Sequence, residues 1–186
     1  MMNLANKLTI LRILIIPFVI ACLIYNSFAA HITALVLFII ASVTDFADGY
    51  IARKYNLVTN FGKFADPLAD KLLTISVMIM FTASGQMPAV ASVIIVAREL
   101  TVTGLRTIAL EKGRVLAAAW SGKVKTCTQM VGLTAIMLLN ILSAAGIDFY
   151  QLAVCRAISW IMAAVTFCSG LEYLVKNKDV ILDKSN

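Results

Sequence analysis

Long apolar runs separated by short polar connections are the main pattern of this chain. The runs lie near residues 8–25, 31–53, 66–83, 88–110, 122–143 and 150–175. Each is close to the ~20 residues that an α-helix needs to cross the hydrocarbon layer of a membrane. The stretch before the first run mixes polar and apolar residues, which is typical of a short helix at the membrane interface. We therefore expect an all-α, polytopic membrane protein with six transmembrane helices and a short N-terminal interfacial helix, in one domain over residues 1–186.

The composition supports this fold class. Hydrophobic residues make up 61% of the chain and charged residues only 14%, with a mean hydropathy of +0.90, which is far more apolar than a soluble domain. The four cysteines fall inside the apolar runs without any C-x-x-C pair. Because this spacing favours neither a disulfide framework nor a zinc site, we interpret the cysteines as packing residues.

Basic residues are concentrated on one side of the expected membrane protein. The connections near 26–30 and 83–87 carry no charge, whereas lysines and arginines cluster near the termini and the other connections. Because basic loops stay in the cytoplasm, both termini and the region 45–70 are expected to face it, in a bacterial cell (inner) membrane. The net charge of +6 suits a surface near anionic lipid headgroups, and no nucleic-acid partner is expected. The only histidine, His31, lies on the uncharged side and is interpreted as an ordinary interfacial residue.

Two pairs of aspartates lie at the ends of apolar runs. Asp45 and Asp48 are three residues apart, and Asp66 and Asp70 are four apart, so a helix puts each pair on one face. Carboxylates without partners are costly beside hydrocarbon, and they normally mark a functional site with bound cations. Because no histidine or cysteine accompanies them, these oxygen ligands favour Mg²⁺ or Mn²⁺ over zinc. Four carboxylates suffice for two ions, which clamp the attacking and leaving oxygens in phosphoryl transfer.

Small residues accompany the first aspartate pair. Gly49 and Ala52 fall on the same helix face as Asp45, where their small volume leaves room for a nucleotide or a diphosphate. Arg53 adds a cation that can neutralise such a group. This part of the chain therefore points to a diphosphate substrate.

A second group of charges lies later in the chain. Arg98 and Glu99 fall near the middle of the fourth run, and Arg106 follows Arg98 by two helical turns, on nearly the same face. Lys123 and Lys125 open the fifth run. Taken separately, these residues are explained by a structural ion pair, a snorkelling arginine and the basic bias of cytoplasmic loops. Taken together, the cations favour an anion-binding pocket.

The carboxylate segment resembles the signature of a known family. The pattern D-x2-D-G-x2-A-R-x8-G-x3-D-x3-D is matched at every fixed position between 45 and 70, and it is similar to the signature of the CDP-alcohol phosphotransferases. Eight fixed positions at this spacing form a specific signal. Several other segments resemble the phosphatidylglycerophosphate synthase branch of that family, namely residues 6–12, 97–99, 103–106, 122–126 and 169–173. The resemblance thus covers most of the chain.

The resemblance implies a fold and a reaction. It implies a six-helix membrane enzyme, commonly a homodimer among membrane lipids, that uses two divalent ions, Mg²⁺ or Mn²⁺. The implied reaction transfers the phosphatidyl group of CDP-diacylglycerol to the primary hydroxyl of sn-glycerol 3-phosphate. Its products are phosphatidylglycerophosphate and CMP.

The resemblance also implies a role for each residue of the motif. Asp45, Asp48 and Asp66 are expected to be metal ligands, and Asp70 is expected to contact a metal ion and to act as the general base. The cytidine diphosphate is expected to contact Gly49, Ala52 and Arg53. The acceptor's phosphate is expected to bind the four cations of the second group, Arg98, Arg106, Lys123 and Lys125.

Two alternative functions remain open at this point. Another member of the same family, such as a cardiolipin or phosphatidylinositol-phosphate synthase, would share the metal motif and differ in its acceptor. A cation transporter would also use carboxylates inside the membrane. Transport does not call for the Gly-x-x-Ala-Arg spacing or for a basic pocket, so we favour the enzyme.

Overall fold

The computed structural model describes the backbone of residues 4–54, 60–111, 113, 116, 120–147 and 150–178. It describes the side chains of these residues except those of 4–8, 45–54, 60–68, 70 and 111. The described backbone forms six α-helices and no strand: α1 Leu4–Tyr25, α2 Phe28–Lys54, α3 Asn60–Ala83, α4 Ala89–Glu111, α5 Trp120–Ala144 and α6 Gln151–Lys176. The all-α prediction is thereby confirmed.

The first helix differs from the sequence-based expectation. Leu4–Tyr25 is one continuous helix, so the described residues contain no separate N-terminal interfacial helix. The reason is local, because this stretch has no glycine and its single proline, Pro17, does not interrupt the helix. The polar residues of its first turns therefore belong to the same helix, with the same pattern of backbone hydrogen bonds, as the apolar residues that follow.

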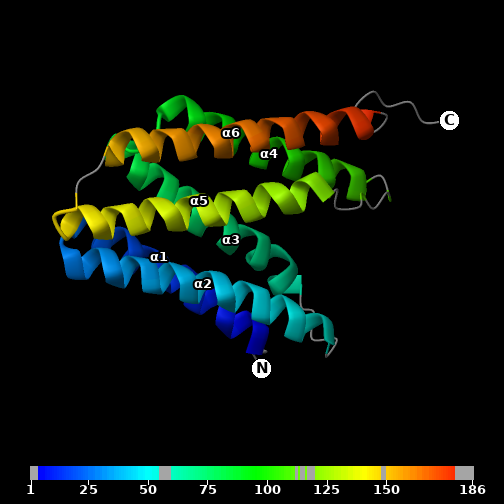
Figure 1. The fold of residues 1–186 in the computed structure, drawn as a ribbon. Helices are drawn as coiled ribbons and strands as arrows, with labels where there is room; N and C mark the ends of the chain where they lie inside the picture. The colour runs from blue at the N-terminus through cyan, green and yellow to red at the C-terminus, as the bar shows by residue number, and fades with distance from the viewer. Residues whose placement is uncertain are drawn as a thin grey trace.

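The helices form one connected bundle (Figure 1). α1 packs on α2 and α3, and α6 packs on α4 and α5. Contacts of α5 with α2, and of α4 with α3, join these two groups. The main core lies where they meet and includes Phe38 of α2, Phe81 of α3 and Met137 of α5, each at most 2% exposed. Close van der Waals packing of such large apolar side chains holds the helices together.

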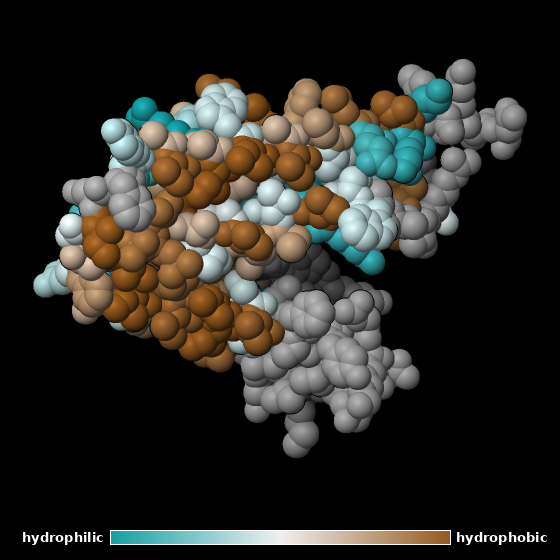
Figure 2. Space-filling view, viewed as in Figure 1, coloured by the Kyte–Doolittle hydropathy of each residue, from teal (hydrophilic) through white to brown (hydrophobic). Residues whose placement is uncertain are grey.

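Much of the outer surface is also apolar. Figure 2 shows apolar side chains over much of the visible face of the described helices. Exposed examples include Phe18 of α1, Val93 of α4 and Val131 of α5, which are each more than 60% exposed. An apolar surface of this extent normally faces a membrane or a partner. Among the described residues, α5 and α6 are long and apolar enough to cross a membrane, so these features indicate a membrane protein, while six membrane spans stay a prediction.

Glycines end two of the helices with left-handed turns. Gly85 follows α3 with φ +74°, and Gly146 follows α5 with φ +83°. Glycine adopts this conformation without the steric cost that other residues meet. The first of these turns carries Gln86 to the side of α5, where its side chain bonds to Asn140.

His31 differs from its expected environment. Its side chain is only 7% exposed, and its Nε2 lies 2.9 Å from the Oδ1 of Asn26. The sequence predicts an ordinary interfacial residue, but His31 is buried among polar side chains at one end of the bundle. This environment depends on the tertiary structure. Asn26 lies in the α1–α2 connection and Gln86 in the α3–α4 connection, and both line the cavity that His31 also lines.

Candidate functional site

The aspartate motif lies on two helices. Asp45 and Asp48 fall within α2, and Asp66 and Asp70 fall within α3. Because both segments are helical, spacings of three and four residues put the two aspartates of each pair on one face of their helix. The side chains of these four aspartates, and those of Gly49, Ala52 and Arg53, lie outside the described residues. The metal and nucleotide assignments therefore remain predictions.

A buried arginine of α1 contacts α2 shortly before the aspartate motif. Arg12 is 1% exposed, and its Nε donates a hydrogen bond of 3.1 Å to the carbonyl oxygen of Ala41 on α2. Ala41 precedes Asp45 by four residues, which is one helical turn. Arg12 thus places a cation one turn from the first aspartate. Sequence analysis included its position only within a resembling segment and gave it no role in the site.

A side-chain contact joins the end of the motif to α4. Lys71, the residue after Asp70, donates a hydrogen bond from its Nζ to the hydroxyl of Thr103. The same hydroxyl donates a 2.7 Å bond to the backbone carbonyl of Glu99, one turn earlier on α4. The charged turn of α4 is therefore tied to the helix that carries Asp66 and Asp70.

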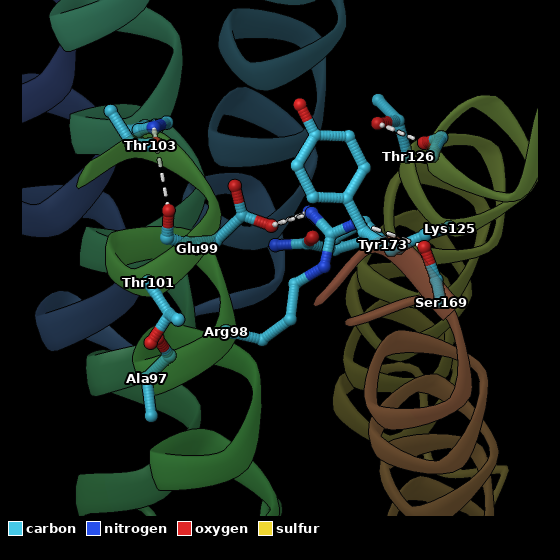
Figure 3. Close-up of polar contacts among 12 residues, drawn as sticks. Ala97, Arg98, Glu99, Thr101, Thr103, Lys125, Thr126, Ser169 and Tyr173 are labelled. Carbon is cyan, nitrogen blue, oxygen red and sulfur yellow. Dashed lines mark hydrogen bonds and ion pairs between the residues drawn. The ribbon is translucent and has the colours of Figure 1, made fainter. Parts of the chain in front are cut away.

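Three side chains meet in an ion-pair cluster between α4 and α5 (Figure 3). The Oε1 atom of Glu99 accepts a 3.3 Å bond from Nη1 of Arg98 and also pairs with Nζ of Lys125. All three side chains are mostly buried, with 12%, 13% and 6% exposed for Arg98, Glu99 and Lys125. We call these three residues the cation cluster. Its two cations, which are 27 residues apart in the sequence, are brought together by one carboxylate oxygen.

Helix α6 fixes the arginine of this cluster. Nη2 of Arg98 donates a 2.8 Å hydrogen bond to the hydroxyl of Ser169. The stem of Arg98 lies against Gly170, where an added Cβ atom would be only 2.7 Å from Cγ of Arg98. The Nε atom of Arg98 is buried and makes no hydrogen bond with the described residues. The guanidinium is thus held in place from two sides while one donor stays unused.

Arg106 lies beside the cation cluster rather than inside it. Its Nε donates a 3.1 Å hydrogen bond to the hydroxyl of Tyr173, and its guanidinium carbon lies 5.4 Å from the centre of that ring. Tyr173 is 2% exposed and follows Ser169, the partner of Arg98, by four residues on α6. A buried tyrosine of α6 therefore orients an exposed arginine of α4. Sequence reasoning gave Tyr173 no role, although it lies in a segment that carried the family resemblance.

Lys123 is placed differently from Lys125. It is exposed, and none of the contacts among the described residues joins it to the cation cluster. Two residues along a helix correspond to a rotation of about 200°, so the two lysines project from nearly opposite faces of α5. Of the four expected anion ligands, the structure brings Arg98 and Lys125 together, places Arg106 on Tyr173, and leaves Lys123 apart.

The charge of this region favours an anion. Arg98, Lys125 and Arg106 carry three positive charges against the single carboxylate of Glu99 in the contacts described above. The two mostly buried cations, Arg98 and Lys125, are costly unless anions and hydrogen bonds compensate them. A simple structural ion pair would need only Arg98 and Glu99. The remaining cations and the unused Nε of Arg98 are suited to binding a phosphate or a similar anion.

Comparison with known proteins identifies the relatives of this chain. The sequence model of the family described as CDP-alcohol phosphatidyltransferase matches residues 2–171. A protein of Bacillus subtilis (strain 168) named CDP-diacylglycerol–glycerol-3-phosphate 3-phosphatidyltransferase is 41% identical, over 97% of this chain and 98% of its own length. A protein of the same name from Rickettsia felis is 44% identical, over 92% of this chain and 93% of its own. A probable phosphatidylglycerophosphate synthase of Mycobacterium tuberculosis is 37% identical, over 94% of this chain and 81% of its own.

Proposed function

This chain belongs to the CDP-alcohol phosphatidyltransferase family, and from that premise we propose that it makes phosphatidylglycerophosphate. It transfers the phosphatidyl group of CDP-diacylglycerol to the primary hydroxyl of sn-glycerol 3-phosphate and releases CMP. The main observation behind this proposal is that two relatives, 41% and 44% identical over nearly the whole chain, bear the same enzyme name. The cation cluster supports it, because an acceptor that carries a phosphate needs fixed cations.

The donor half of the reaction is assigned to the aspartate motif. Four carboxylates on two helical segments form a donor set that fits two divalent ions, Mg²⁺ or Mn²⁺. We assign Asp45, Asp48, Asp66 and Asp70 to hold them. When bound, such ions supply positive charge that stabilises the diphosphate as it is cleaved. Gly49 and Ala52 leave room for the cytidine diphosphate, and Arg53 neutralises part of its charge.

The displacement itself requires one proton transfer. The hydroxyl oxygen of the acceptor bonds to the phosphorus that carries the diacylglycerol, and the bond from that phosphorus to the CMP oxygen breaks. Asp70 takes the proton of the hydroxyl as the general base. The contact of the next residue, Lys71, with Thr103 of α4 supports this assignment, because it ties α3 to the helix assigned to the acceptor.

The acceptor half is assigned to α4 and α5. Arg98 and Lys125 bind the phosphate of glycerol 3-phosphate, and Glu99 holds these two cations together. Arg106, oriented by Tyr173, adds a further positive charge at the edge of the pocket. Lys123 contributes at longer range, since it is exposed on another face of α5. Three nearby cations suit a phosphate dianion better than an uncharged alcohol.

The membrane topology and the oligomeric state of the protein are also part of the proposal. We propose six membrane spans in a bacterial inner membrane, with both termini and the active site facing the cytoplasm, where glycerol 3-phosphate is available. The concentration of basic residues near the expected cytoplasmic connections supports this orientation. A homodimer is proposed from the resemblance to the family. Family membership favours this enzyme over a cation transporter.

An acceptor panel tests the proposed function. Purified protein is given CDP-diacylglycerol with glycerol 3-phosphate, phosphatidylglycerol, inositol phosphate or glycerol, and the release of CMP is measured for each acceptor. We expect glycerol 3-phosphate to give by far the highest kcat/KM. Preference for phosphatidylglycerol or inositol phosphate would instead identify a cardiolipin or phosphatidylinositol-phosphate synthase.

A further inference from the structure

A polar cavity lies at the end of the bundle opposite the cation cluster. Lys125 lies in the second turn of α5, whereas Asn140, which lines the cavity, lies in the second-last turn of the same helix. The cavity has a volume of about 240 Å³. Its walls come from the α1–α2 connection, α2, the α3–α4 connection, α5 and α6. None of the proposed catalytic or anion-binding residues lines it.

Asn140 is the centre of a hydrogen-bond network in the wall of this cavity. Its Oδ1 accepts bonds from Nε2 of Gln86 at 2.8 Å and from Nε2 of Gln151 at 2.7 Å. Its Nδ2 donates a 3.1 Å bond to Oε1 of Gln86. These bonds fix the positions of three amide side chains from three different parts of the chain. The polar wall is therefore preorganised before any ligand enters.

Several polar atoms of the wall are left without partners. Because Nε2 of His31 faces the amide oxygen of Asn26, it is the donor of that pair, and Nδ1 is left as an acceptor. Nδ1 is buried and makes no hydrogen bond with the described residues. No contact among the described residues uses Oε1 of Gln151 or Nδ2 of Asn26 either. The amides of Gln151 and Asn26 therefore leave one acceptor and one donor unused by the described residues, and His31, which also lines the cavity, holds a buried acceptor without a described partner.

The chemistry of the wall selects an uncharged, hydroxyl-rich ligand. No lysine, arginine, aspartate or glutamate is among the described residues that line the cavity. The described part of the lining thus offers no counter-ion to a phosphate or an ammonium group, whereas its neutral amides suit an uncharged ligand. Hydroxyl groups both donate and accept hydrogen bonds, which matches the mixture of unused atoms. At roughly 30 Å³ of liquid volume for each water molecule, the cavity is also much larger than one bridging water needs.

An exposed arginine lies beside this cavity and favours a lipid as the source of the ligand. Arg156 of α6 is exposed, and its Nε donates a 3.4 Å hydrogen bond to the carbonyl oxygen of Gly85, the neighbour of Gln86. We propose that the cavity binds the uncharged polyol end of a lipid headgroup, while Arg156 pairs with the phosphate of the same lipid. The apolar surface of the surrounding helices provides contact with the lipid's chains.

The single histidine makes a direct test possible, because isotope-labelled histidine gives one imidazole NMR signal per chain. The labelled full-length protein is placed in phosphatidylcholine bilayers with increasing fractions of phosphatidylglycerol, whose headgroup ends in glycerol. We expect the His31 signal to move to a saturated position. Phosphatidylserine, which has the same net charge and no polyol, should leave the signal in place.

Matched variants separate the cavity from the bilayer surface. Ala144→Phe fills the mouth of the cavity and should abolish the saturable change, whereas Ala145→Phe, one residue further and outside the lining, should preserve it. Arg156→Gln should weaken the response to phosphatidylglycerol about tenfold or more, as expected for a lost charge-assisted hydrogen bond.

Three results would overturn the proposal. Equal responses to phosphatidylserine and phosphatidylglycerol would show that the signal reports surface charge. A saturable response to free glycerol but not to phosphatidylglycerol would show that the ligand is a soluble polyol. The absence of a saturable response to both would show that the cavity holds only water.

Discussion

Gly170 on α6 lies directly against the side chain of Arg98 on α4. A Cβ atom at position 170 would be 2.7 Å from Cγ of Arg98, closer than carbon atoms of neighbouring side chains approach. Because Arg98 also bonds to Ser169, the backbone of α6 sets the direction of this guanidinium. A residue without a side chain thus determines where a cation of the proposed acceptor site lies.

The first prediction follows from this contact. Gly170→Ala should displace Arg98 from Ser169 and from Glu99, and so weaken one charge-assisted interaction of about 1.5–3 kcal/mol with the acceptor's phosphate. We expect kcat/KM for glycerol 3-phosphate to fall about ten- to hundredfold, with little change in the KM for CDP-diacylglycerol. Steady-state kinetics of CMP release measure both values.

Gly132→Ala is a matched control for this variant. It creates a clash between α5 and α6, against the sulfur of Met162, in the apolar core. This control should lower thermal stability without a selective effect on the acceptor. If both variants change the kinetics for the two substrates equally, general damage to helix packing explains the result and Arg98 has no special role.

The second prediction contrasts two lysines of the same helix. Lys125→Ala removes a mostly buried cation paired with Glu99 and should lower kcat/KM for glycerol 3-phosphate at least tenfold. Lys123→Ala removes an exposed cation whose field is screened by solvent, so its effect should be within about threefold. Equal losses in the two variants would contradict the placement of the acceptor between α4 and α5.

The third prediction concerns the orientation of Arg106. Tyr173→Phe keeps the ring beside the guanidinium and removes only the hydroxyl that accepts its 3.1 Å bond. A single hydrogen bond of about 0.5–1.5 kcal/mol corresponds to a two- to tenfold rise in the KM for glycerol 3-phosphate. Tyr173→Leu, which also removes the ring, should raise this KM further. Identical kinetics for wild type and both variants would remove Tyr173 from the site.

The fourth prediction tests the aspartate motif. Activity should be lost when divalent ions are removed with a chelator and should return when Mg²⁺ or Mn²⁺ is added. Asp70→Asn should lower kcat by about 10²–10⁴ because it lacks a general base, while binding of CDP-diacylglycerol to the protein persists in equilibrium measurements. A parallel loss of binding would identify Asp70 as mainly a metal ligand.

The sequence was sufficient to predict the helices because each apolar run is close to one membrane thickness in length. For example, the run predicted at 122–143 became helix Trp120–Ala144. The spacing of the charges also predicted which cations of α4 share a face. It did not tell Lys123 and Lys125 apart as ligands: the helical period puts them on different faces, but only the ion pair of Lys125 with Glu99 shows which face lies toward α4.

The sequence did not reveal the partners that orient the cations. Tyr173 contacts Arg106 across 67 residues, and Ser169 contacts Arg98 across 71. Helical periodicity describes neighbours within one helix and carries no information about such pairs. The same limit applies to His31: its partner Asn26 is only five residues away, but Gln86 and Gln151, which line the same cavity, are distant in sequence.

The bond between Lys71 and Thr103 gives the proposed site a fixed length scale. In the proposed reaction, α4 and α5 hold the phosphate end of the acceptor, and Asp70 on α3 receives the proton from its hydroxyl end. Because Lys71 follows Asp70 directly, its contact with Thr103 limits how far the backbone of α3 at Asp70 can move from α4. On the proposed assignment, the site therefore accepts only acceptors of a narrow range of lengths. A phosphorylated alcohol with a longer carbon chain would bind its phosphate and present its hydroxyl beyond the reach of the base.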